Sequence, residues 1–274
     1  QDTKGENSVA IGDQTLATQN FTTATDTYNV AVGSSAGNQV TTGSQNTLIG
    51  GIAGDAFTTG SRNTGLGYAT LTSDTKGGYA VAIGYEALQT QNFTTAVNNY
   101  NIGIGYQAGG AVTTGVENVL IGGLAGDALT DADFNVALGT VSLSSDTLGS
   151  RSTALGYAAL NAQNFTTATH VYNVAVGHGA GNVITTGVQN TLIGGLAGDD
   201  LQDADFNVAL GYASLSSDTL GSRSTALGWA TLNSQNFTTA TNSYNVAVGF
   251  HSGLGLTTAQ NSTFVGSFTG GGAV

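Results

Sequence analysis

Two acidic clusters are the residues of this chain whose types and spacing most suggest chemistry. The clusters contain Asp127, Asp131, Asp133, Asp199, Asp203 and Asp205. Carboxylates at alternate positions supply the hard oxygen ligands that Ca²⁺ prefers. An earlier copy of the stretch keeps only Asp55, and no glutamate follows at a set distance to act as a bidentate ligand. The pattern favours solvated acidic turns without a cofactor, and a weak calcium site is the alternative.

No arrangement of residues in the chain predicts catalysis. The three histidines, His170, His178 and His251, are scattered, and no Ser–His–Asp arrangement recurs. The chain has no cysteine, which excludes a thiol nucleophile, a cysteine-ligated zinc site and a disulfide framework. We therefore expect a protein that is not an enzyme. A glycan-cleaving spike is a further alternative, and it requires two carboxylates about 5–10 Å apart in a groove.

Four copies of the segment QNFTTA form a second candidate surface. Their aromatic and sequon residues are Asn20, Phe21, Asn92, Phe93, Asn164, Phe165, Asn236 and Phe237. A row of phenylalanines could bind glycans or a partner fibre, but we favour packing of each Phe beneath its own loop. The asparagines are N-glycosylation sequons, with a fifth at Asn261. Because duplication copies one sequence four times, these sequons count as one observation.

The charge composition limits the partners. Only 8% of residues are charged, and 17 acidic against 5 basic residues give a net charge of −12. So few cations exclude a polycationic nucleic-acid surface and a polybasic membrane patch, and no apolar run is long enough for a transmembrane helix. Asp146 and Asp218 lie five residues before Arg151 and Arg223, and we expect weak exposed ion pairs there.

A short repeat specifies the elements that position all these residues. The pattern β-branched–small–aliphatic–Gly occurs 15 times, with spacings of 21, 17, 17 and 17 residues in a 72-residue superrepeat. The last residues of the pattern, here called key glycines, are Gly12, Gly33, Gly50, Gly67, Gly84, Gly105, Gly122, Gly139, Gly156, Gly177, Gly194, Gly211, Gly228, Gly249 and Gly266. One strand per period with glycine turns predicts an all-β parallel solenoid of about 15 turns.

Side chains alternate across a strand, so the two large residues of the pattern share one face. We expect these two residues to form the core. The small residue between them then either lets neighbouring chains approach or fits inside a narrow coil. The fourth residue after each key glycine is Leu or Gly only, in the order Leu, Gly, Gly, Leu.

The residue four before the key glycine is asparagine ten times. These residues are Asn29, Asn46, Asn63, Asn101, Asn118, Asn135, Asn173, Asn190, Asn207 and Asn245. Stacked asparagine side chains can hydrogen-bond from turn to turn. A ladder that stabilises the turns is favoured over a polar ligand-binding row.

The turn sequences resemble known fibrous proteins. NSVAIG at Asn7–Gly12, YNVAVG at Tyr28–Gly33 and TTGSQNTLIG at Thr41–Gly50 are similar to the head repeats of YadA-type trimeric autotransporter adhesins and to repeats of phage tail fibres. The resemblance extends over all 15 turns, although the turns here are longer than those of adhesin heads and no stalk or anchor is visible. It implies a left-handed β-roll that forms a side-by-side homotrimer.

These patterns together predict one repetitive domain over residues 1–274, with superrepeats at about 1–72, 73–144, 145–216 and 217–274. We expect a non-catalytic, adhesive shaft or head of an extracellular fibre, either a surface adhesin or a matrix filament. Its expected partners are further copies of itself and a cell-surface or matrix glycan or protein receptor, with no nucleic acid and no membrane insertion. A phage tail-fibre segment on the virion exterior is an alternative. Because the chain begins and ends inside superrepeats, it is expected to be part of a longer repetitive protein or a self-stacking filament subunit.

Overall fold

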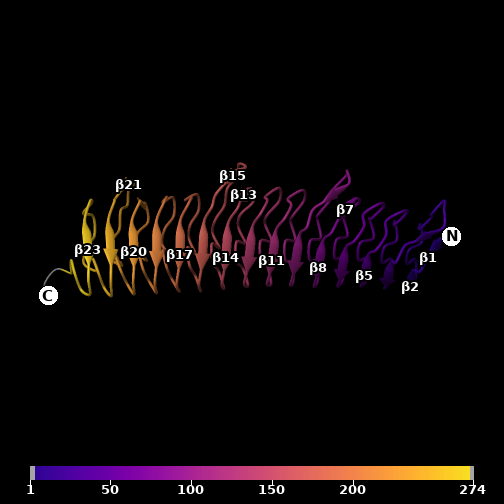
Figure 1. Ribbon diagram of the computed structural model, residues 1–274, viewed down its shortest axis with the longest axis horizontal. Coiled ribbons are helices and arrows are strands. Elements are labelled where there is room, and N and C mark those ends of the chain that lie inside the picture. The colour runs from indigo at the N-terminus through magenta and orange to yellow at the C-terminus, as the bar shows by residue number, and fades with distance from the viewer. Residues whose placement is uncertain (1–3, 272–274) are drawn as a thin grey trace. The chain divides into compact units, whose positions relative to one another are not determined.

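The computed structural model describes residues 4–271, which form β-strands and turns. The chain divides into two compact units, residues 1–135 and 136–274, and each unit is a stack of short coils (Figure 1). Residues 4–271 contain no helix and thus no helical membrane span. The prediction of an all-β parallel solenoid is confirmed.

Each coil contributes one three-residue strand to a parallel sheet. In the first unit these strands are β2 (Val9–Ile11), β4 (Val30–Val32), β5 (Thr47–Ile49), β6 (Thr64–Leu66), β8 (Val81–Ile83), β10 (Ile102–Ile104) and β11 (Val119–Ile121). In the second unit they are β12 (Val136–Leu138), β14 (Thr153–Leu155), β16 (Val174–Val176), β17 (Thr191–Ile193), β18 (Val208–Leu210), β20 (Thr225–Leu227), β22 (Val246–Val248) and β23 (Thr263–Val265). Equivalent residues pair directly, as Ala31 does with Leu48 between β4 and β5.

Eight two-residue strands pair in parallel beside the 21-residue coils. In the first unit the pairs are β1 (Gly5–Glu6) with β3 (Thr25–Asp26) and β7 (Gly77–Gly78) with β9 (Val97–Asn98). In the second unit they are β13 (Gly149–Ser150) with β15 (Thr169–His170) and β19 (Gly221–Ser222) with β21 (Thr241–Asn242).

The side chains of the three-residue strands point opposite to our expectation. The middle residue faces the interior, and Ala31 and Leu48 are at most 1% exposed. The flanking residues lie outside, and Ile11 and Leu66 are 60% and 44% exposed. The prediction that the flanking residues form the core is therefore wrong. The interior of the coil is too narrow for the two rows of flanking side chains. The Leu48 side chain alone nearly fills it, because a Cβ added at Gly54 would lie only 2.8 Å from Leu48.

The interior explains why only Leu or Gly stands four residues after each key glycine. The backbone there is left-handed, with φ of +52° at Leu71 and +54° at Gly54. Coils with Leu at this position carry a polar residue three positions later, such as Asp74, whereas coils with Gly carry an apolar one, such as Phe57. A Cβ added at Gly54 would lie 2.6 Å from the Phe57 ring. Each coil thus has room for one bulky apolar side chain in this region, supplied from one position or the other.

The key glycines permit close stacking of the coils. Gly50 has a φ of +142°, and an added Cβ would lie 2.2 Å from the carbonyl oxygen of Gly67 in the next coil. Only glycine adopts this backbone conformation without strain. The conformation of the turn therefore requires glycine at this position in every repeat.

The asparagine ladder is structural, as favoured from the sequence. Asn46, fully buried, donates from Nδ2 to the Gly60 carbonyl at 2.9 Å, and its Oδ1 accepts the Asn63 N–H at 3.0 Å. Where the ladder reaches a long coil, a buried glutamine joins it: Gln91 accepts from Asn101 at 2.9 Å and donates to Asp74 at 2.7 Å. The ladder therefore continues through a different side chain where the sequence has Ala or Ser.

Candidate functional site

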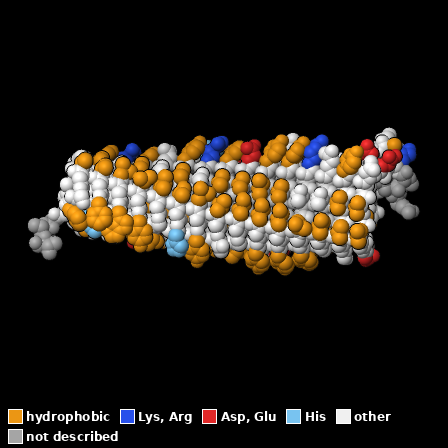
Figure 2. Space-filling view, turned by 60° about the horizontal axis from the view of Figure 1, so that its bottom comes forward, with side chains coloured by type: hydrophobic (Ala, Val, Ile, Leu, Met, Phe, Trp, Pro, Cys, Tyr) orange, Lys and Arg blue, Asp and Glu red, His pale blue; other side chains and the backbone are white. Residues whose placement is uncertain are grey.

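The outward residues of the three-residue strands form an exposed apolar surface. We call the residues three and one before the key glycines the apolar strip. From each coil the strip holds a β-branched residue, which is Val or Ile in nine coils and Thr in six, and a Val, Ile or Leu. Exposure is 46% at Leu210 and 49% at Leu138, and most other strip residues of the inner coils are half-buried. Figure 2 shows rows of hydrophobic side chains on this face. No charged side chain belongs to the strip, so it can pack against an uncharged surface without burying an ion.

Aromatic residues directly after the key glycines form stacked tracts within each unit. In the first unit Tyr68, Tyr85 and Tyr106 stack with ring centroids 5.5 and 5.6 Å apart. In the second unit Tyr212, Trp229 and Phe250 stack at 6.1 and 5.2 Å.

The ring faces of these tracts are covered by neighbouring rings, and roughly half of each side chain remains exposed. Tyr85 donates a hydrogen bond to Glu86, and that bond together with the carboxylate charge raises the pKa of Tyr85. Because stacked faces leave mainly edges free, the tracts suit packing against a surface better than stacking on a sugar ring. Sequence reasoning missed these tracts, although the recurrence of aromatics directly after the key glycine was a readable signal.

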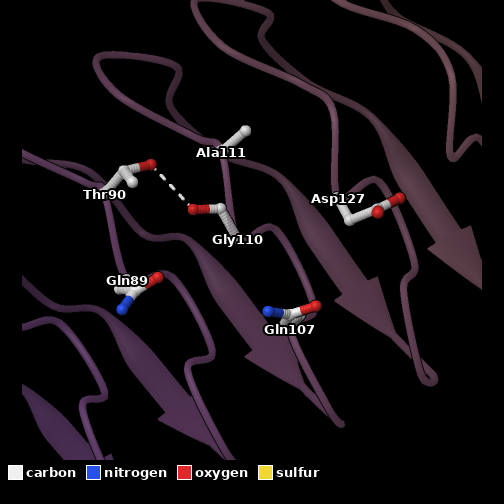
Figure 3. Close-up of a pocket in the computed structure, with 6 residues that line it drawn as sticks. All are labelled: Gln89, Thr90, Gln107, Gly110, Ala111 and Asp127. Carbon is white, nitrogen blue, oxygen red and sulfur yellow. Dashed lines mark hydrogen bonds between the residues drawn. The ribbon is translucent and has the colours of Figure 1, made fainter.

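A depression of about 240 Å³ lies on the first unit (Figure 3). Its lining residues are Gln89, Thr90, Gln107, Gly110, Ala111 and Asp127. Thr90 donates to the Gly110 carbonyl at 2.7 Å, and Gln107 donates to Glu86 at 2.7 Å. Asp127 is the one carboxylate in the lining. The depression can hydrogen-bond a hydroxyl-bearing ligand, but a glycosidase-type reaction needs a second carboxylate.

The carboxyl groups of Asp127 and its equivalent Asp199 have raised pKa values. Each has one buried oxygen that accepts no hydrogen bond among the described residues. Burial raises the pKa of Asp127, and burial, together with the charge of Asp200, raises that of Asp199 to about 6. Both groups therefore hold a proton more readily than a solvated aspartate does.

The structure does not bring the predicted acidic clusters together as ligand sets. Asp131 accepts from Thr114 Oγ1, and Asp133 from the Val116 N–H. Asp203 and Asp205 repeat these bonds with Thr186 and Val188. Within residues 4–271 no group of three or more acidic or histidine residues could hold a metal ion. The acidic turns cross-link adjacent coils, and nothing in the described geometry supports calcium binding.

The long-coil loops place their phenylalanines and asparagines differently. Phe21, Phe93, Phe165 and Phe237 are buried, with 5–8% of each residue exposed. An aromatic binding row at these residues is therefore not formed.

The sequon asparagines lie nearer the surface. Asn20 and Asn164 are exposed, whereas Asn92 and Asn236 are half-buried. Thr75 donates to the Oδ1 of Asn92 at 3.2 Å. The fifth sequon asparagine, Asn261, is exposed. Modification at these positions stays a prediction.

The expected ion pair between Asp218 and Arg223 is wrong. Asp218 is buried and accepts hydrogen bonds from the Gly221 and Phe237 backbone N–H groups and from Gln235. Arg223 instead lies with its guanidinium carbon 4.6 Å from the centroid of the Phe206 ring. Asp146 is buried among the equivalent donors. These aspartates accept interior hydrogen bonds, and the sequence separation alone did not reveal it.

Comparisons of the chain with protein-family models, with curated proteins and with solved structures find no match. The resemblance of the turns to adhesin heads and phage tail fibres stays a prediction from the sequence motifs.

Proposed function

We propose that this chain is a non-catalytic structural element of an extracellular fibre, built by side-by-side association of copies through the apolar strip. In this role it presents surface loops away from a cell or virion and thereby supports adhesion. The observation that carries the proposal is the strip itself: an uncharged double row of aliphatic and β-branched side chains on the outer face of every coil.

The size of the strip supports an interface. Coils are spaced about 4.8 Å apart and two side chains of one face span about 10 Å, so seven coils carry roughly 300 Å² of strip. The eight coils of the second unit carry roughly 400 Å² in the same way, about half of the roughly 800 Å² that each partner buries in a standard protein interface. Monomeric proteins rarely expose contiguous apolar patches beyond a few hundred Å².

The regular spacing of the strip supports another copy of the chain as the partner. Side chains that repeat at each coil interdigitate over many coils only with a surface of the same repeat height, and a second solenoid of this sequence has that height. Because no charged side chain belongs to the strip, association through it brings no like charges into direct contact. The resemblance to adhesin heads would make the assembly a trimer.

Sedimentation velocity and electron microscopy test the proposal. The chain should form oligomers whose population rises with concentration. Replacement of Ile49 and Ile104 in the strip by lysine should give monomers, because each lysine places a charge in the interface. Thr95→Lys, on an exposed loop away from the strip, is the matched control and should assemble normally. A wild-type chain that stays monomeric, or strip variants that assemble as the wild type does, would refute the proposal.

A further inference from the structure

A second depression on the first unit gathers two of the five cations of the chain. It has a volume of about 190 Å³ and lies beside the β7–β9 pair. The lining residues that bear on its chemistry are Ser61, Arg62, Lys76, Gly78, Tyr79 and Asn98. No acidic side chain lines it, although the chain carries 17 acidic residues. Such a concentration of positive charge in an acidic chain indicates a site for an anion.

Neither cation is neutralised within residues 4–271. Arg62 and Lys76 form no ion pair with a carboxylate there. The acid nearest to Lys76 in sequence, Asp74, is buried and accepts hydrogen bonds from the Gly77 N–H at 2.9 Å, the Phe93 N–H at 3.1 Å and Gln91 Nε2 at 2.7 Å. Its oxygens are thus held by interior donors, and the two cations remain available to a ligand.

The walls of the depression position one of these cations. The Arg62 guanidinium carbon lies 5.2 Å from the centroid of the Tyr79 ring, and Tyr79 packs in turn against Tyr100 at 5.1 Å. This cation–π contact restricts the arginine before any ligand arrives. Gly78 has no side chain where the equivalent residues in later superrepeats are Ser150 and Ser222, and a Cβ added to Gly78 would lie 2.9 Å from the Ser61 carbonyl oxygen.

The other superrepeats show that the coil does not require these charges. At the positions 72 and 144 residues after Arg62 the chain has Phe134 and Phe206. At the positions 72 and 144 residues after Lys76 the chain has Leu148 and Leu220. The same backbone therefore forms with apolar residues at both sites. The later arginines still lie over aromatic rings, as Arg223 does over Phe206, but no lysine accompanies them.

We propose that this depression binds the anionic group of an acidic saccharide, a carboxylate or a sulfate. Arg62 and Lys76 pair with the anion, and Ser61 and Asn98 hydrogen-bond neighbouring hydroxyls, while the Tyr79 ring holds the Arg62 guanidinium in place. The volume is below the about 300–1,000 Å³ of small-molecule pockets, so the site fits a single unit of a longer glycan. The inference deepens the proposed adhesive role, because it names the chemistry of a receptor.

Titration calorimetry with the full chain tests the site. The probes are an oligogalacturonate for carboxylates, a heparin-derived oligosaccharide for sulfates, a neutral malto-oligosaccharide and poly-glutamate as an acidic peptide. We expect binding to one or both acidic saccharides, weakened by added salt, and none to the neutral one. Arg62→Phe and Lys76→Leu, which copy the residues of the later superrepeats, should each weaken binding about tenfold or more, as loss of one charge-assisted hydrogen bond does.

Arg223→Phe is the matched control, since it removes an arginine that also lies over an aromatic ring but outside the depression, and it should bind as the wild type does. The inference is overturned if no acidic saccharide binds, if the double variant binds equally well, or if poly-glutamate binds as tightly as the saccharides. Sedimentation of the same samples reports assembly separately, so loss of ligand binding and failure of the fibre proposal are distinguishable.

Discussion

Replacing Asn46 by alanine tests the asparagine ladder directly. Asn46 is fully buried, and its side chain is the hydrogen-bond partner of the Asn63 N–H at 3.0 Å and of the Gly60 carbonyl at 2.9 Å. Alanine keeps the backbone bond from the residue-46 N–H to Asn29 but leaves those two groups without a partner. Each buried group left unpaired costs about 1–3 kcal/mol, so we expect a loss of about 3 kcal/mol.

The loss should be local, because coils in a solenoid contact only their neighbours. Hydrogen–deuterium exchange of residues 60–66, read by mass spectrometry, should accelerate about 100-fold, since each 1.4 kcal/mol is a factor of about ten. Asn20→Ala, at an exposed position, is the control and should leave exchange unchanged. The chain tolerates Ala80 in the ladder because the N–H of Asn101, the next ladder residue, donates instead to Asn99 Oδ1 at 3.0 Å. Exchange of residues 60–66 within about threefold of the wild type would refute the reasoning.

Three further predictions follow from the interior, the turns and the carboxyls. Leu192→Ala, at a fully buried residue, should lower the free energy of unfolding by about 3 kcal/mol in urea titrations, whereas Leu210→Ala on the strip should reduce self-association instead. Gly50→Ala should cost about 2 kcal/mol or more in the same titrations, because φ is +142° and the added Cβ meets the Gly67 carbonyl, whereas Gly123→Ala has open space and should be nearly neutral. The raised pKa of Asp199, about 6, means that its contribution to stability is present below the unfolded pKa and lost as pH rises through about 6. Asp199→Asn should therefore raise the melting temperature more at pH above about 7 than near pH 4, and an equal shift at both pH values would contradict this.

The repeat made the architecture predictable in advance. Fifteen key glycines at fixed spacing, with alternating residues before them, specified a parallel solenoid, its coil lengths and its ladder of stacked asparagines. The reason is that each coil repeats the environment of the previous one, so the same residue pattern recurs in every coil and can be recognised in the sequence. The burial of Phe93 was also expected from the sequence.

The direction of the strand side chains could not be read from the pattern. Alternation shows that Val30 and Val32 share a face, but not whether that face is inside or outside. The width of the coil decides this, because the opposite wall leaves room only for Ala31 and its equivalents. The tertiary structure therefore turned the presumed core into an exposed apolar strip.

The same distinction applies to the charged residues. The sequence by itself determined that cations are few and that Arg62 and Lys76 replace the phenylalanine and leucine of later superrepeats. Only the folded coils place these two side chains, 14 residues apart in the chain, in one depression, and turn Asp74 toward interior donors. Periodicity fixes which residues recur at each height of the stack, whereas the width of the coil and the path of its turns decide which of them meet.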